Sequence, residues 1–107
     1  MTAPLRVGLA GLGSMGRNHL RHLSSREDCV LAAVGDPDPG VLADAVAKTS
    51  ATGFADPLVM IEQAGIEAVV IAAPTTAHSP LALAAIERLK PVARRVGANI
   101  EFRRSME

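Results

Sequence analysis

The chain alternates short apolar runs with segments of helical periodicity, and this order restricts its fold more than any other feature. The runs that fit strands cover residues 5–10, 29–35, 53–55 and 67–73. Cys29–Gly35 contains no charge, and the fourth run is apolar from Ala68 onward, so both are too apolar for a sheet with one face in water. Apolar strands that alternate with helices predict an α/β fold, a single-domain doubly wound parallel sheet with right-handed crossovers.

The segments between the runs fit helices. They are expected from Ser14 to Leu23, from Pro39 to Lys48 or Thr49, from Pro57 to Gln63, and from about His78 or Ser79 to Leu89. Two of these helices begin with aspartate followed by proline, at Asp38 and Asp56, a pairing that caps a helix and fills its first turn. Gly65 is expected to end the third helix.

The helical and strand pattern weakens after residue 90. Residues 91–96 fit a fifth strand only in part, because Arg94 and Arg95 stand where a central strand would need apolar side chains. We therefore predict a domain at residues 1–90 and a divergent C-terminal segment at residues 91–107.

Composition excludes several classes of protein. Among 107 residues, Lys plus Arg and Asp plus Glu both number 11, so there is no general electrostatic reason to bind nucleic acid or an anionic membrane. Aromatic residues make up 2%, with no Trp or Tyr, which removes the stacking platforms of single-strand binders. The one cysteine, Cys29, excludes an intrachain disulfide and a multi-cysteine zinc site. We expect a cytoplasmic protein with no metal, nucleic-acid or membrane partner.

The first apolar run leads into Gly11-Leu12-Gly13-Ser14-Met15-Gly16, which fits the pattern G-x-G-x-x-G. In a turn that joins a strand to a helix, the first glycine allows the tight turn, the second lets a pyrophosphate approach the backbone, and the third lets the helix lie close to the sheet. The N–H groups of Ser14, Met15 and Gly16 would then point at the pyrophosphate. The pattern predicts a dinucleotide site that includes Gly11 and Gly13; the alternative is a tight turn without a ligand.

An acidic residue follows the second run. Asp36 lies 36 − 16 = 20 residues after Gly16, which is about the spacing expected for a carboxylate that binds the adenosine ribose. Such a carboxylate would repel a 2′-phosphate, so NAD is favoured over NADP. Asp38 competes for this role, although it is better placed to cap a helix, and Asp36 could itself be only a turn or cap aspartate.

Three segments resemble the N-terminal NAD(P)-binding domain of the glucose–fructose oxidoreductase, inositol dehydrogenase and rhizopine catabolism (Gfo/Idh/MocA) family. They are residues 11–20, residues 32–39 and residues 69–78. The third, an apolar strand that ends in Ala-Pro-x-x-x-His, is the most particular of the three.

The resemblance also implies roles for residues after the fourth run. Ala73, Pro74 and Thr75 would lie along the nicotinamide-side ribose and the phosphates, and His78 would sit near the nicotinamide end. An exposed histidine without a role is the alternative for His78. His19 matches the family's histidine on the first helix and is expected to be a packed or surface residue.

The chain departs from the family's usual Glu-Lys-Pro motif, whose lysine is a catalytic and cofactor-contacting residue in the family. Either Lys90-Pro91 belongs to the turn before a fifth strand, which places Arg95-Val96-Gly97 in that slot, or Lys90-Pro91 is itself the Lys-Pro pair and the strand is missing. Neither alignment keeps the pattern, so we assign no catalytic residue.

The family's second domain, which carries the substrate pocket, is expected to be absent. The resemblance therefore implies the cofactor domain of an oxidoreductase that transfers a hydride between nicotinamide and a sugar- or polyol-like secondary alcohol, and that domain is not expected to be competent alone. The alternative is a non-catalytic nucleotide-binding or oligomerisation module of the same fold. The surface that the absent domain would cover is expected to mediate homo-oligomerisation.

Overall fold

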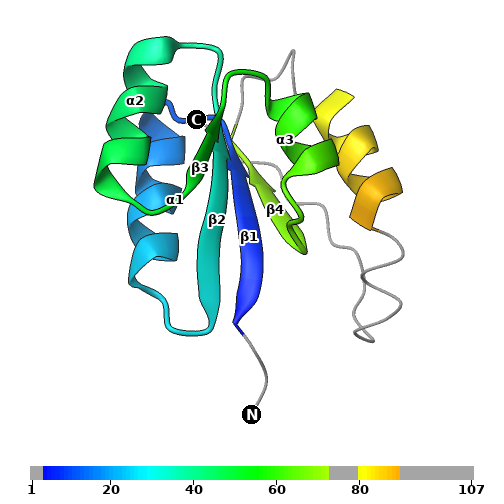
Figure 1. Cartoon of the computed structure of the whole chain (residues 1–107), viewed down its shortest axis with the longest axis horizontal. Helices are drawn as coiled ribbons and strands as arrows, with labels where there is room; N and C mark the ends of the chain where they lie inside the picture. The colour runs from blue at the N-terminus through cyan, green and yellow to red at the C-terminus, as the bar shows by residue number, and fades with distance from the viewer. Residues whose placement is uncertain (1–3, 73–79, 90–107) are drawn as a thin grey trace.

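The strands form one parallel sheet in the computed structural model, which describes residues 4–72 and 80–89 (Figure 1). The described strands are β1 (Leu5–Ala10), β2 (Cys29–Gly35), β3 (Thr52–Phe54) and β4 (Ala68–Ile71). They are arranged in the order β3-β2-β1-β4, and every neighbouring pair is parallel. The predicted α/β doubly wound sheet is confirmed.

The helices cover both faces of this sheet. They are α1 (Ser14–Ser25), α2 (Pro39–Lys48), α3 (Pro57–Gln63) and a helical segment at residues 80–89. The chain moves outward from β1 through β2 to β3, so right-handed crossovers place α1 and α2 on the same face. It then returns past β1 to reach β4, which places α3 on the other face together with the 80–89 helix (Figure 1).

Each face of the sheet has its own aliphatic core. Leu9 and Ala10 are fully buried neighbours on β1, and their side chains point to opposite faces because side chains alternate along a strand. Leu9 packs in the cluster beneath α1 and α2, whereas Ala10 packs in the cluster with Met60 and Ile61 of α3. Each large side chain buried in this way stabilises the fold by about 1.5–3 kcal/mol.

Both predicted aspartate caps are confirmed. The side chain of Asp38 accepts hydrogen bonds from the N–H groups of Gly40 and Val41 at the start of α2. The side chain of Asp56 accepts from the N–H group of Leu58 at the start of α3. A proline follows each aspartate in the first helical turn.

The element boundaries agree with the predictions except at a few ends. α1 continues to Ser25, two residues beyond the predicted end at Leu23, where the hydroxyls of Ser24 and Ser25 donate to the carbonyl oxygens of Leu20 and His22. β3 is shifted by one residue, to Thr52–Phe54, and β4 is shorter than the predicted run. The predicted strand at 91–96 lies outside the described residues. No helix within the described ranges is both long and apolar enough to cross a membrane.

Candidate functional site

The turn between β1 and α1 begins at a glycine with a left-handed backbone. Gly11 has φ 100°, a value that strains residues with a Cβ atom. Its N–H group donates a 2.8 Å hydrogen bond to the carbonyl oxygen of Gly35, at the end of β2. The turn is therefore fixed to the carboxyl edge of the sheet before α1 begins.

The third glycine of the motif lies against this turn. A Cβ atom on Gly16 would overlap the carbonyl oxygen of Gly11 and lie 2.7 Å from the carbonyl carbon. Because both neighbours are backbone atoms, they cannot move aside as the end of a flexible side chain could. Gly16 is thus required by the close packing of α1 against the turn.

Gly13 differs from the other two, because open space surrounds it. A Cβ atom there would meet no heavy atom within 4 Å. Gly13 is the N-cap of α1, and its carbonyl oxygen accepts a 2.8 Å hydrogen bond from the N–H group of Arg17. The N–H groups from Ser14 to Gly16 have no partner inside the helix, and no acidic residue stands in this first turn. The arrangement suits a phosphate group in front of Gly13.

The Asp36 carboxylate joins the glycine turn to the turn after β2. Oδ2 accepts a 2.8 Å hydrogen bond from the N–H group of Leu12, and Oδ1 accepts a 2.9 Å hydrogen bond from the N–H group of Asp38. The proposed turn role of Asp36 is therefore seen directly. Each carboxylate oxygen has two lone pairs, so each keeps one acceptor position for a ribose hydroxyl, and the ribose role stays a prediction.

The glycine turn lies at the point where the direction of the chain across the sheet reverses. β1 lies between β2 and β4, and the crossovers that leave β1 and β3 cover opposite faces. Ligands of doubly wound folds bind in the crevice at the carboxyl ends of the strands at such a point. The N–H group of Ala72 donates a 2.8 Å hydrogen bond to the carbonyl oxygen of Ala10, which brings the end of β4 beside the glycine turn.

Several predicted site residues cannot be placed in this arrangement. Ala73, Pro74, Thr75 and His78 lie outside the described residues. His19 is half-buried on α1, which agrees with a packed or surface role.

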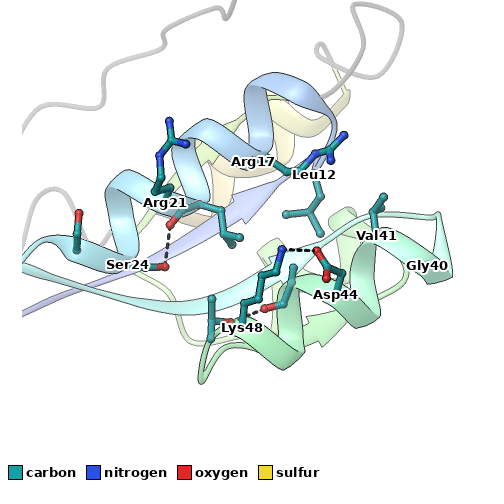
Figure 2. Close-up of a pocket in the computed structure, with 12 residues that line it drawn as sticks. Leu12, Arg17, Arg21, Ser24, Gly40, Val41, Asp44 and Lys48 are labelled. Atoms are coloured by element: carbon teal, nitrogen blue, oxygen red, sulfur yellow. Dashed lines mark hydrogen bonds and ion pairs between the residues drawn. The ribbon is translucent and has the colours of Figure 1, made fainter.

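A groove of about 680 Å³ separates α1 from α2, and the sequence reasoning missed it (Figure 2). Its lining includes the buried Leu12 and Leu20, and its charged lining residues are Arg17, Arg21, Asp44 and Lys48. Three of these side chains are cationic and one is anionic. The signal in the sequence was the i, i+4 spacing of each charged pair, which places its members on one side of a helix.

Two of the cations in the groove have polar partners. Lys48 Nζ lies 3.0 Å from Asp44 Oδ2 across one turn of α2. Arg21 Nη2 donates a 3.1 Å hydrogen bond to Asn18 Oδ1 on α1.

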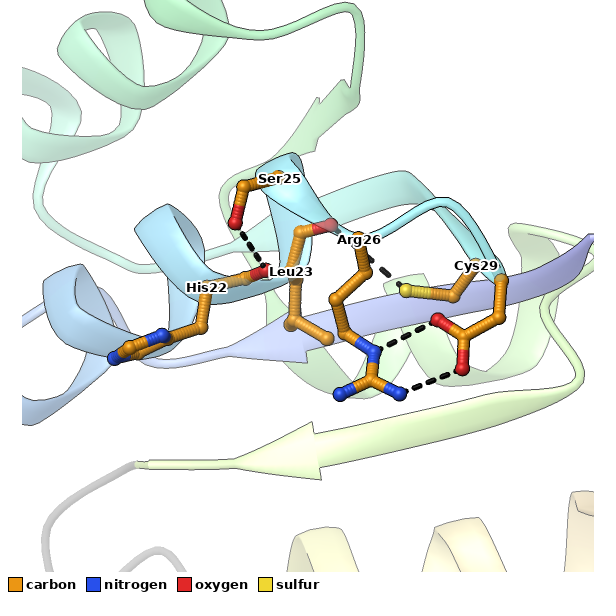
Figure 3. A network of polar contacts seen from close by, with 6 residues as sticks. His22, Leu23, Ser25, Arg26 and Cys29 are labelled. Atoms are coloured by element: carbon orange, nitrogen blue, oxygen red, sulfur yellow. Dashed lines mark hydrogen bonds and ion pairs between the residues drawn. The ribbon is translucent and has the colours of Figure 1, made fainter.

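A separate polar network lies at the connection between α1 and β2 (Figure 3). Arg26 donates from Nε and Nη2 to the two oxygens of Asp28, at 2.8 and 2.6 Å. These hydrogen bonds lower the pKa of Asp28 and raise the pKa of Arg26. The Cys29 Sγ donates a weak 3.8 Å contact to the carbonyl oxygen of Leu23. The network lies at the end of β2 opposite to the glycine turn.

Within residues 4–72 and 80–89, no group of His, Cys, Asp and Glu side chains could hold a metal ion. The groups that the described site offers are backbone amides, one carboxylate and the cations of the neighbouring groove.

Residues 5–93 match the model of a family described as an oxidoreductase family with an NAD-binding Rossmann fold. The chain is 46% identical over 90 residues to inositol 2-dehydrogenase 4 of Saccharopolyspora erythraea, a match that covers 82% of this chain and 27% of that protein. It thus spans about a quarter of the length of this relative.

Among the solved structures with a similar fold are two inositol dehydrogenases. One is apo scyllo-inositol dehydrogenase from Lactobacillus casei, with a TM-score of 0.77 and 26% identity over 82% of this chain and 27% of that one. The other is myo-inositol dehydrogenase from the same organism in complex with NAD(H) and myo-inositol, with a TM-score of 0.74 and 27% identity over 79% of this chain and 26% of that one.

Proposed function

This chain belongs to the Gfo/Idh/MocA oxidoreductase family, and on that premise we propose that residues 1–90 bind a nicotinamide adenine dinucleotide. The observation that carries the proposal is the difference among the three glycines. The left-handed backbone explains why residue 11 is a glycine, and close packing explains why residue 16 is one. Gly13, by contrast, is surrounded by open space and lies beside N–H groups that have no partners inside the helix. A pyrophosphate fits that space and those donors.

The chain's own residues would position the dinucleotide. The amides from Ser14 to Gly16 would bind the pyrophosphate, and Asp36 would accept from the ribose hydroxyls. Ala73, Pro74, Thr75 and His78 would continue the site toward the nicotinamide, since they follow the end of β4, where Ala72 is bonded to Ala10. The nicotinamide, when bound, carries the reactive hydride.

The proposed reaction of the whole enzyme is hydride transfer between this cofactor and the secondary alcohol of a sugar or polyol. The names of the relatives, which are inositol dehydrogenases, support this substrate class. The chain covers 27% of the relative from Saccharopolyspora erythraea, and we assign no proton-transfer residue within it. We therefore expect the chain to bind cofactor without turning over a polyol alone.

Titration with NADH tests this function directly. The chain has no Trp or Tyr, so NADH fluorescence can be followed with little background from the protein. We expect saturable binding and no reduction of NAD by a panel of polyols. Turnover of any polyol would show that the chain is competent alone. A well-folded sample that gave no calorimetric signal with any adenine dinucleotide would refute the cofactor assignment.

Replacing Asp36 with alanine should weaken NAD binding about 10- to 150-fold, since a charged hydrogen-bond acceptor contributes about 1.5–3 kcal/mol. The margin by which NAD is preferred over NADP should narrow, because the carboxylate that repels a 2′-phosphate is removed. Parallel titrations of wild type and variant with NADH and NADPH measure both effects.

Asp56→Ala is the matched control for this variant. Asp56 also accepts a hydrogen bond from a backbone N–H group after a strand, but it caps α3 on the other face of the sheet. Its replacement should lower stability by about 1 kcal/mol and leave both affinities unchanged. If Asp36→Ala binds each cofactor as tightly as wild type does, then Asp36 is only a turn residue.

We also propose that the chain associates with copies of itself. Among the described strands β4 pairs only with β1, and Leu83 on the 80–89 helix is 64% exposed. An exposed leucine of this kind favours contact with another chain. Light scattering that showed a monodisperse monomer at high concentration would contradict it. A cytoplasmic location stays a prediction of the sequence.

A further inference from the structure

The groove between α1 and α2 has an apolar base. Leu12, Leu20 and Ala45 line it and are buried, and Val41 lines it and is half-buried. The two helices follow the parallel strands β1 and β2, so they run in the same direction along one face of the sheet. A groove with an apolar base between two helices fits the apolar side of a third helix, which is a recurring way of binding peptides.

The two walls of the groove differ in charge. Figure 2 shows Arg17 and Arg21 on α1, facing Asp44 and Lys48 on α2. On the α2 wall, Lys48 Nζ lies 3.0 Å from Asp44 Oδ2, so these two charges compensate each other. On the α1 wall nothing offsets the arginines locally, because none of the 12 residues of α1 is acidic. The α1 wall is therefore cationic, whereas the α2 wall is close to neutral.

Both arginines of the α1 wall are open to an acidic partner. Both are exposed, and within residues 4–72 and 80–89 neither forms an ion pair. The Arg21 guanidinium donates one hydrogen bond, at 3.1 Å, to the neutral side chain of Asn18. Residues four apart on a helix lie about 5–6 Å from each other, so Arg17 and Arg21 match two carboxylates that are four residues apart on a neighbouring helix. A guanidinium binds a carboxylate through parallel N–H donors.

The dimensions of the groove suit a short helical contact. Its lining residues on α1 extend from Arg17 to Ser25, which is about 12 Å at about 1.5 Å per residue, or roughly two turns. Its volume is about 680 Å³. A contact of this length belongs to the small, transient class of interfaces. The aliphatic base also separates this site from a purely electrostatic surface for a phosphate backbone, which has no need of buried leucines.

We propose that the groove between α1 and α2 binds an acidic amphipathic helix of another protein. The apolar side of that helix lies on the base of the groove, and carboxylates four residues apart along one flank face Arg17 and Arg21 on α1. The flank toward α2 carries no such requirement, since Asp44 and Lys48 are already paired. This inference goes beyond the proposed cofactor function and does not depend on it.

The probe for this site is a synthetic amphipathic peptide of about 15 residues, long enough for a helix to form in water. Its leucines lie on one side, and its glutamates lie four residues apart along one flank of that side. The control peptide has the same composition, with the glutamates moved to the side opposite the leucines. Fluorescence anisotropy of the labelled peptides with the full chain should show saturable binding of the first peptide, weakened by added salt, and at least about fourfold weaker binding of the control.

Two double variants locate the binding in the groove. Arg17→Gln/Arg21→Gln should lower the affinity for the first peptide about 4- to 25-fold, since each exposed ion pair contributes about two- to fivefold. Arg6→Gln/Arg88→Gln is the matched control, because it removes the same charge from two exposed arginines that do not line the groove. This control should bind the peptide as wild type does. Circular dichroism melts verify that both variants fold.

Several results would overturn the proposal. One is a dissociation constant of the first peptide above about 1 mM, and another is equal binding of the two peptides or equal affinities of the two double variants. Self-association that only Arg17→Gln/Arg21→Gln abolishes would mean that a second copy of this chain fills the groove. A short DNA duplex that binds more tightly than the peptide, and that the same variant weakens, would mean that the groove recognises negative charge without a helix.

Discussion

Replacing Gly13 with valine should abolish dinucleotide binding and leave the fold intact. The valine side chain would project into space that holds no heavy atom within 4 Å of the Cβ position, so it would not strain the protein. The same side chain would occupy the place of the pyrophosphate. NADH titration should show no saturation at concentrations that saturate wild type, a loss of about 100-fold or more if the displaced phosphate contacts amount to about 3 kcal/mol.

The unfolding transition of the Gly13→Val variant serves as its internal control. The melting temperature without cofactor should stay close to that of wild type, because no contact is removed. Saturable binding of NADH to a folded variant would show that the phosphate lies elsewhere.

Replacing Gly16 with alanine should destabilise the fold itself, whereas Gly13→Val should not. Alanine favours a helix interior over glycine by about 1 kcal/mol, so propensity alone predicts a gain. The added Cβ would overlap the carbonyl group of Gly11, and a backbone neighbour can yield only if the turn or α1 moves. Overpacking of this kind costs about 1–3 kcal/mol or more, so we expect the clash to outweigh the gain.

Thermal unfolding without cofactor measures this effect. A loss of 1 kcal/mol lowers the melting temperature of a domain of this size by about 4–8 °C. A variant as stable as wild type would mean that α1 lies less close to the glycine turn than the structure shows. Together the two variants separate the glycine that the fold requires from the glycine that we propose the ligand requires.

The sequence specified the strands and helix starts well because their signals are local. Cys29–Gly35 is an uncharged apolar run of strand length, and the aspartate–proline pairs at Asp38 and Asp56 are local signals for helix starts. The end of α1 was missed because it depends on the hydroxyls of Ser24 and Ser25, which bond back to the helix.

The less predictable parts of the site depend on contacts between distant residues. The hydrogen bond from Leu12 to Asp36 joins residues 24 positions apart, and it exists only because β1 and β2 end side by side. The groove likewise depends on how α1 and α2 pack against one face of the sheet, which the periodicity of either helix alone does not specify.

The hydrogen bond between Leu12 and Asp36 also affects how tightly a cofactor would bind. Because this bond already joins the two turns that would hold the adenosine, the protein loses little conformational freedom when the ligand arrives. Such preorganisation leaves more of the interaction energy available as affinity. It also favours a rigid, lock-and-key encounter at this half of the site.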